Sequence, residues 1–283
     1  MTQRISVVGG GTMGNGIVQV MAQAGHAVTL IERSNADAER AVAMIRTNLG
    51  RLVSKGKIDK IQADAIHGRV TSADSYGAAA ESDFVIEAVF ENLALKQEIA
   101  RAITPTLNEG AIFASNTSSI SLTAIAAASH RPGQVAGMHF FNPVPVLQLV
   151  EVVRAEQTTD ETVDRVCALA TQIGKSPVVV NDFPGFISNR VLLPMINESI
   201  FCLGEGVATK EAIDDVMKLG MAHPMGPIAL ADLIGLDVCL AILEVLQRDL
   251  GEDKYRPAPL LRKMVAAGKL GRKSGEGFYS YGS

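Results

Sequence analysis

Residues 4–25 read RISVVGGGTMGNGIVQVMAQAG, and this stretch decides the fold. It begins with a short β-branched run, residues 4–8, and continues at once into a glycine-rich turn, residues 9–14. Apolar residues at helical spacing then follow until Gly25. This order of strand, glycine turn and helix is that of a dinucleotide-binding βαβ unit, and the context gives the Gly-x-Gly-x-x-Gly spacing a weight that it lacks alone.

The three spaced glycines have separate expected roles. Gly9 permits the tight turn, Gly11 lets a pyrophosphate approach the backbone, and Gly14 lets the helix pack closely on the strand. Thr12 and Met13 lie at the start of the helix, where unpaired N–H groups and the helix dipole favour the negative charge of phosphates. We therefore predict a dinucleotide site at Gly9, Gly11, Thr12, Met13 and Gly14.

A second β-prone run, residues 27–31, ends at Glu32. A carboxylate at this position accepts hydrogen bonds from both hydroxyls of the adenosine ribose and repels a 2′-phosphate. Arg33 weakens that preference, because a guanidinium pairs with phosphate. The two residues together favour NAD as the cofactor, with NADP the less favoured one.

The segment GMHFFNPVPVLQLVE, residues 137–151, carries a candidate acid–base pair. Two β-prone runs flank a turn with prolines at 143 and 145, which fix φ and oppose a helix. The runs can lie side by side and bring Glu151 to His139, so that the carboxylate selects the tautomer of the imidazole. The residues leave a second interpretation open, in which His139 ends a strand and Glu151 faces water.

Polar residues also follow two predicted buried strands, residues 83–89 and 111–114. Glu91 comes after the first strand, and the hydroxyl-rich loop SNTSS, residues 115–119, comes after the second. Open α/β sheets bind their ligands at the carboxyl ends of the strands. The hydroxyls of the 115–119 loop can either cap the next helix or bind a substrate oxygen.

Residues 36–67 depart from a simple alternation of strands and helices. Their apolar positions mark one face of a long helix, and Arg51 and Lys55, four residues apart, are neighbours on the other face. Such a basic pair can hold a polyphosphate, although it is more often a solvated surface. The pattern alone leaves both interpretations open.

From residue 184 onward the β signals stop. Residues 186–203 predict a helix with a kink at Pro194. Further helical patterns cover residues 210–219, 228–234, 236–250 and 257–267. We therefore expect an N-terminal nucleotide-binding domain, residues 1–183, and an all-α domain, residues 184–283, that binds substrate and forms a dimer interface.

Length and composition bound the class of protein. The chain has 283 residues, enough for two domains, and is 47% hydrophobic and 20% charged, as is usual for a globular protein. A net charge of −4 gives no electrostatic reason to expect nucleic acid or an anionic membrane as a partner, and no apolar run is long enough to span a bilayer. The N-terminal apolar run is too short for a secretory signal, and three widely spaced cysteines suit buried, reduced thiols. These features predict a cytoplasmic protein without a bound metal.

Together the motifs resemble those of the L-3-hydroxyacyl-CoA dehydrogenases, and most closely the bacterial 3-hydroxybutyryl-CoA dehydrogenase type. The resemblance covers essentially the whole chain. Its most specific stretches are SNTSSI (115–120), GMHFFNPVPV (137–146) and PGFISNR (184–190), with support from LVEVV (149–153), HPMGP (223–227) and GRKSGEGFY (271–279).

The resemblance implies an α/β fold, namely a Rossmann-type, doubly wound and mainly parallel sheet with a helical-hairpin insertion, followed by an all-α domain. It implies an NAD-dependent oxidoreductase that interconverts (S)-3-hydroxyacyl-CoA and 3-ketoacyl-CoA. The expected hydroxyacyl substrate is 3-hydroxybutyryl-CoA. The partners implied are therefore an acyl-CoA and a second copy of the chain, in a homodimer formed through the helical domain.

The resemblance also assigns roles to residues at matching positions. His139 is implied to be the catalytic base and Glu151 its partner, while Ser118 and Asn189 contact the substrate from the two sides of a cleft between the domains. Arg51 and Lys55 fall where bacterial members place basic residues near coenzyme A. Further residues are implied on the cofactor side of the site: Glu91, Lys96, Asn116 and Asn142.

Two residues depart from the family pattern. Glu32 stands where an aspartate is common, and its equal charge keeps NAD as the expected cofactor. Gln148 replaces a lysine or methionine and can alter the acyl-chain preference. The sequence leaves three other functions open: a dehydrogenase for 3-hydroxyadipyl-CoA, a dehydrogenase of the same fold for a hydroxy or sugar acid without CoA, and a non-catalytic NAD-binding protein. The presence of all four implied catalytic residues, Ser118, His139, Glu151 and Asn189, argues against the non-catalytic protein.

Overall fold

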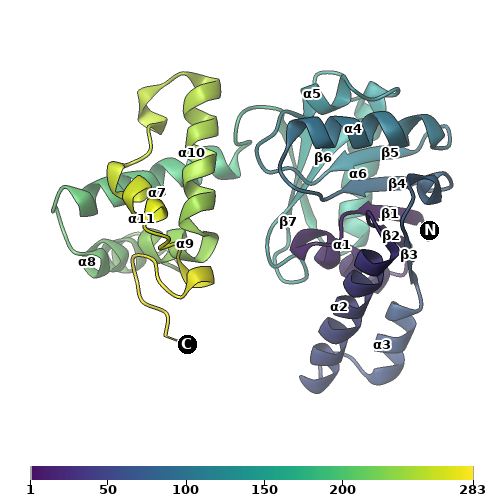
Figure 1. Ribbon diagram of the computed structural model, residues 1–283, viewed down its shortest axis with the longest axis horizontal. Coiled ribbons are helices and arrows are strands. Elements are labelled where there is room, and N and C mark those ends of the chain that lie inside the picture. The colour runs from purple at the N-terminus through teal and green to yellow at the C-terminus, as the bar shows by residue number, and fades with distance from the viewer. Residues whose placement is uncertain (1, 283) are drawn as a thin grey trace. The chain divides into compact units, whose positions relative to one another are not determined.

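A computed structural model describes residues 2–282, and the chain divides into two compact units between Asp182 and Phe183. The sequence placed this boundary one residue later. An eight-stranded sheet and its helices form the first unit, whereas the second is built from helices. Figure 1 shows the two units by colour, with the sheet in purple to teal and the helical unit in green to yellow.

The sheet confirms the predicted doubly wound and mainly parallel architecture. Its strand order is β3-β2-β1-β4-β5-β6-β7-β8, and all neighbours are parallel except β6 and β7. The order reverses at β1, where β2 and β4 lie on opposite sides, and this is the position at which such sheets form a nucleotide crevice. The strands are β1 (Arg4–Val8), β2 (Ala27–Ile31), β3 (Val70–Ala73), β4 (Phe84–Glu87), β5 (Ile112–Ser115), β6 (Val135–Phe140), β7 (Leu149–Arg154) and β8 (Ser176–Asn181).

Helices cover the sheet and exclude water from it. Helices α1 and α6 share one buried cluster with strand residues, in which Ile17 and Met21 of α1 and Val166 and Leu169 of α6 are fully buried. This burial accounts for the apolar spacing that predicted both helices. The helices of this unit are α1 (Thr12–Gln23), α2 (Asn35–Ser54), α3 (Lys60–His67), α4 (Leu93–Ile103), α5 (Leu122–Ala126) and α6 (Asp160–Gln172), with 3-10 turns at Tyr76–Ala79, Thr104–Thr106 and Pro132–Gln134.

Helices α2 and α3 form the predicted helical-hairpin insertion, which extends away from the sheet (Figure 1). The Ser34 side chain caps the start of α2 by accepting the Asp37 N–H. Gly56 adopts a φ of +64° after α2, and Asp59 begins α3 with a capping box to Gln62. These signals divide the apolar stretch into two helices.

The β4 strand is shorter than predicted, because it ends at Glu87 instead of residue 89. The Glu87 side chain accepts a hydrogen bond from the Val89 N–H at 2.7 Å, and this contact takes Val89 out of the strand ladder. A 3-10 turn at Tyr76–Ala79 precedes β4.

The second unit packs its helices around a separate core that includes Leu193, Ile196, Leu243 and Leu246. Pro194 lies inside α7 as predicted. The helix expected at 210–219 ends earlier and continues as a π-helical segment, Val216–Gly220. The remaining helices are α7 (Ser188–Gly204), α8 (Lys210–Asp215), α9 (Pro227–Ile234), α10 (Leu236–Leu250) and α11 (Pro259–Ala266), with 3-10 turns at Asp253–Tyr255 and Arg272–Ser274.

Two expectations from composition can be compared with the described residues. No helix within residues 2–282 is long and apolar enough to cross a bilayer. Cys239 is a buried thiol as predicted, whereas Cys167 and Cys202 are only half-buried, because each lies at the edge of its helix core instead of inside it.

Candidate active site

The glycine turn after β1 contains three glycines at which a Cβ would clash with the protein itself, namely Gly9, Gly14 and Gly10, whose Cβ would lie 2.5 Å from that of Ala41. Gly9 has a φ of +99°, and a Cβ there would lie 2.8 Å from the Ala88 carbonyl oxygen. A Cβ on Gly14 would lie 1.8 Å from the Gly9 carbonyl oxygen. Both distances are too short for a side chain, so these two positions fix the turn and the contact between α1 and β1.

Gly11 differs from these three positions, because a Cβ built on it meets no protein atom within 4 Å. Its φ of −64° is also open to any residue. Gly11 is the N-cap of α1 and provides no side-chain cap, so the N–H groups of the first turn face the space in front of the helix. The glycine therefore keeps open a space in which an anion can approach these N–H groups.

A cavity of about 770 Å³ lies in front of this turn. Its lining includes the predicted cofactor residues Gly9, Gly11, Thr12, Met13 and Glu32. Glu32 accepts a hydrogen bond from the Gly10 N–H at 2.5 Å, which holds the carboxylate at the end of β2. The cavity, the uncovered helix start and this carboxylate fit the phosphates and ribose of a dinucleotide.

His139 and Glu151 are directly paired across the antiparallel strands β6 and β7. His139 Nδ1 lies 2.8 Å from Glu151 Oε2, and the side chains are only 8% and 3% exposed. The Phe141 ring packs at 4.5 Å from the imidazole, centroid to centroid. The interpretation in which Glu151 faces water is therefore wrong. The carboxylate instead holds Nδ1 of the imidazole.

The turn that joins β6 to β7 is held by a residue that the sequence did not predict, Lys175. Its ammonium group donates to the carbonyl oxygens of Val144 and Leu147, at 2.5 and 2.7 Å. Burial lowers the pKa of Lys175. Asn142 is exposed in this turn and precedes Pro143 through a cis peptide bond. The sequence pattern around Lys175, a lysine between a helix and the mostly exposed strand β8, carries no signal for this role.

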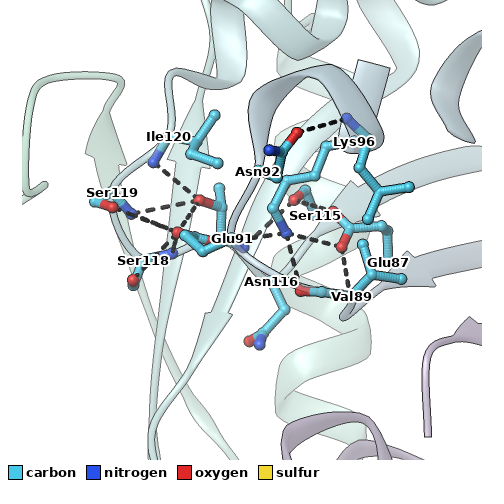
Figure 2. A network of polar contacts seen from close by, with 12 residues as sticks. Glu87, Val89, Glu91, Asn92, Lys96, Ser115, Asn116, Ser118, Ser119 and Ile120 are labelled. Carbon is cyan, nitrogen blue, oxygen red and sulfur yellow. Dashed lines mark hydrogen bonds and ion pairs between the residues drawn. The ribbon is translucent and has the colours of Figure 1, made fainter. Parts of the chain in front are cut away.

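The 115–119 loop gathers around Glu91 (Figure 2). Glu91 Oε1 accepts from Thr117 Oγ1 at 2.6 Å, from the Ser118 N–H at 2.8 Å and from Ser118 Oγ at 3.2 Å. The interpretation of these hydroxyls as helix caps is wrong, because Ser121 is the N-cap of α5. Asn116 instead accepts the Phe140 N–H at 2.9 Å and thereby links the loop to β6.

Lys96 connects Glu91 to a second carboxylate, Glu87, which the sequence analysis did not single out. Lys96 Nζ lies 2.8 Å from Glu87 Oε1 and 3.3 Å from Glu91 Oε2 (Figure 2). The Lys96 side chain is 1% exposed and that of Glu87 is fully buried. The detectable signal was a carboxylate inside an otherwise apolar buried strand, which requires a partner.

Comparison with known proteins identifies the family. The model of the 3-hydroxyacyl-CoA dehydrogenase NAD-binding domain matches residues 4–183, and that of the C-terminal domain matches residues 185–281. The chain belongs to the 3-hydroxyacyl-CoA dehydrogenase family. The predicted enzyme class, an oxidoreductase, and the predicted cofactor, NAD, are thereby confirmed.

Several relatives and solved structures are similar over nearly the full chain. A probable 3-hydroxybutyryl-CoA dehydrogenase of Deinococcus radiodurans is 52% identical over 98% of this chain and 100% of the relative. One of Bacillus subtilis is 52% identical over 99% of this chain and 97% of the relative. The crystal structure of (S)-3-hydroxybutyryl-CoA dehydrogenase from Ralstonia eutropha has a TM-score of 0.96 and 48% identity, with complete coverage of both chains.

The family resemblance also implied Arg51, Lys55 and Asn189 as site residues. Arg51 and Lys55 are exposed near the end of α2, and the contact recorded for Arg51 is a long one, 3.4 Å, to Asn48. Asn189 belongs to the second unit, where it lies in the first turn of α7 and its N–H donates to the Gly185 carbonyl. Within residues 2–282 no group of three His, Cys, Asp or Glu side chains is arranged to hold a metal ion.

Gly11→Ala is expected to weaken NAD binding by about tenfold or more without loss of stability. The added methyl group meets no protein atom but enters the space in front of the first N–H groups of α1. Calorimetric titration with NAD and thermal melting measure the two quantities. Gly50→Ala, whose Cβ also meets no protein atom, should leave NAD affinity unchanged, whereas Gly14→Ala should lower the melting temperature. Equal NAD affinity in the Gly11 variant would contradict the assigned role.

The Glu91 cluster predicts a pH-dependent contribution to stability. Burial raises the pKa of the Glu91 carboxyl, but the Lys96 ammonium and the donors of residues 117–118 lower it more, and the pKa lies below its ordinary value of 4.5. Glu91 therefore stabilises the folded state above the unfolded pKa, and this contribution is lost as the pH falls through the folded pKa.

Urea unfolding across the acid range tests this contribution. The free energy of unfolding of the wild type should fall more steeply below about pH 4.5 than that of Glu91→Gln. Glu109→Gln, which removes an exposed carboxylate, should keep the wild-type slope. If the free energy of unfolding falls with pH equally steeply in the wild type and in Glu91→Gln, the Glu91 carboxylate contributes no pH-dependent stability in the acid range.

Proposed function

We propose that this enzyme interconverts (S)-3-hydroxybutyryl-CoA and acetoacetyl-CoA, with His139 and Glu151 as its acid–base pair. The observation that carries the proposal is the 2.8 Å contact of His139 Nδ1 with Glu151 Oε2, formed on the same sheet as the glycine turn. The names of the relatives from Deinococcus, Bacillus and Ralstonia support the four-carbon substrate.

NAD, when bound, accepts the hydride that leaves C3 of the hydroxyacyl group. In the proposed mechanism His139 Nε2 takes the proton of the 3-hydroxyl, because Nδ1 is held by the carboxylate. Glu151 fixes the ring and stabilises the imidazolium that forms. In the direction of reduction the same nitrogen returns the proton to the 3-oxygen.

The contacts to the rest of the substrate rest on the family resemblance. Ser118 and Asn189 are proposed to donate to the 3-oxygen or the thioester oxygen and so set the pose of the acyl group. Asn142 belongs to the same proposed site, and Arg51 and Lys55 are proposed to pair with the phosphates of coenzyme A.

A substrate and cofactor profile tests the proposal. Loss of NADH absorbance with acetoacetyl-CoA should exceed that with longer 3-ketoacyl-CoA esters, with 3-ketoadipyl-CoA and with free keto acids, when kcat/KM is compared. NADPH should be the poorer reductant. A higher kcat/KM for the dicarboxylic ester or for an acid without CoA would show that the proposed substrate is wrong. NAD binding without turnover of any of these compounds would show that the protein is not this enzyme.

We also propose a homodimer formed through the helical unit. Its surface exposes large apolar side chains, among them Val191, Val216, Leu219 and Met221, which are 60–84% exposed in the single chain. Apolar surface of this extent on one unit is typical of an interface. Light scattering after gel filtration should give twice the chain mass of 29.9 kDa, and a monomer would reject the proposal.

A further inference from the structure

Glu87 is a fully buried carboxylate that takes no part in the proposed proton transfer. It lies at the last position of β4, between Val8 of β1 and Ser115 of β5. Its oxygens accept from Lys96 Nζ at 2.8 Å, from the Val89 N–H at 2.7 Å and from Ser115 Oγ at 2.6 Å. A carboxylate without exposure is costly to bury, and these three donors offset that cost.

Lys96 is the centre of the network around Glu87. Its ammonium group lies between Glu87 Oε1 at 2.8 Å and Glu91 Oε2 at 3.3 Å, and its side chain is 1% exposed. An ammonium group in such a position has few alternative partners. The Glu87 carboxylate therefore determines how far Lys96 can move toward Glu91.

Glu91 in turn holds the loop that carries Ser118. Donors to Glu91 Oε1 come from the side chains or N–H groups of Thr117, Ser118 and Ser119, at 2.6–3.4 Å. If Lys96 moved closer to Glu91, it would compete with these donors for the same carboxylate. The position of Ser118 is thus coupled to Glu87 through two intervening side chains, which Figure 2 shows in sequence.

We infer that Glu87 is a positioning residue that fixes Ser118 for the substrate through Lys96 and Glu91. The inference rests on the proposed function in one respect only, which is that Ser118 contacts the substrate. The coupling itself is a property of the folded chain. A cluster of two carboxylates and one ammonium carries a formal charge of −1, and Glu87→Gln makes it neutral while keeping an oxygen acceptor of the same shape.

Hydrogen exchange tests the coupling without any substrate. In Glu87→Gln the amides of residues 116–120 should exchange about tenfold faster than in the wild type. The matched control is Asp83→Asn, the same change next to the other end of β4, where Asp83 accepts the Arg4 N–H at 2.8 Å. The control should leave the exchange of residues 116–120 unchanged. Unchanged exchange in the Glu87 variant would overturn the inference, whether or not the proposed substrate is correct.

A double-mutant cycle tests the consequence for turnover of acetoacetyl-CoA. Glu87→Gln should lower kcat/KM by about tenfold to hundredfold, as expected for a displaced substrate contact. The same substitution in a Ser118→Ala background should cost less than about twofold, because the two residues act in series. Losses that multiply would overturn the inference. If the wild type does not turn over acetoacetyl-CoA, the proposed function is rejected. Hydrogen exchange alone then tests whether Glu87 positions Ser118.

A milder variant covers the case in which Glu87→Gln fails to fold. Ser115→Ala removes one donor to Glu87 and leaves both carboxylates and the ammonium in place. Ser115 Oγ also accepts the Thr117 N–H at 3.3 Å, so the exchange of this variant is compared only at residues 118–120. It should change amide exchange and kcat/KM in the same direction by smaller amounts. A Ser115 variant that matches the wild type in both measurements, beside a Glu87 variant that does not fold, would assign Glu87 to stability alone and overturn the inference.

Discussion

His139→Gln should lower kcat by about 10²–10⁴-fold, the usual contribution of a positioned general acid or base. Glutamine fills much of the same space and can still bond to Glu151, but it cannot carry a proton between two states near neutral pH. NAD affinity and the melting temperature should stay close to those of the wild type, because the glycine turn and the sheet are untouched. The measurement is steady-state oxidation of NADH with acetoacetyl-CoA, together with NAD titration.

His130→Gln is the matched control for this substitution. His130 belongs to the same unit but is exposed, and its backbone N–H donates to Thr104 Oγ1. Its substitution should leave kcat unchanged. Near-wild-type turnover of the His139 variant would remove the proposed base, and an equal loss in both variants would indicate a nonspecific effect.

Glu151→Gln should lower kcat by about 10²-fold or more, mainly through the orientation of the imidazole. The carboxylate accepts a hydrogen bond from the Nδ1–H group and leaves the unprotonated Nε2 as the base. The amide group of glutamine can instead donate to Nδ1 and place the ring proton on Nε2, where it blocks proton uptake.

Two comparisons make the Glu151 result specific. Glu156→Gln, an exposed carboxylate two residues beyond β7, should not change kcat or the pH–rate profile. The double variant of His139 and Glu151 should be no slower than the His139 variant alone, because the carboxylate acts through the ring. A wild-type kcat in Glu151→Gln would count against the pair.

The pairing of His139 with Glu151 was one of the two interpretations that the sequence left open, and local rules explain why it could be proposed. Prolines 143 and 145 limit the segment to a turn, and the β-prone runs on both sides can then form an antiparallel pair. The nucleotide half of the sheet followed in the same way from strand, glycine and helix order. Both predictions depend on residues that are close in the chain.

The network around Glu87 could not be predicted in this way. Residues 83–89 read as a buried strand, and the pattern contains no information about which distant side chain meets a carboxylate in that strand. Lys96 is close in the chain, but Ser115 reaches Glu87 only because β5 lies beside β4. Lys175 was missed for the same reason, since its two carbonyl partners lie 31 and 28 residues away. Tertiary contacts of single polar groups leave no periodic signal.

The antiparallel return of β7 also affects how such an enzyme can change in evolution. An insertion between Phe140 and Leu149 lengthens only the turn, whereas a one-residue insertion inside β7 would move Glu151 to the opposite face of the sheet. A change of length is therefore expected to be compatible with the paired strands in the turn that carries Gln148 but not in the strand beside it. The turn can vary in length while the register that pairs His139 with Glu151 stays the same.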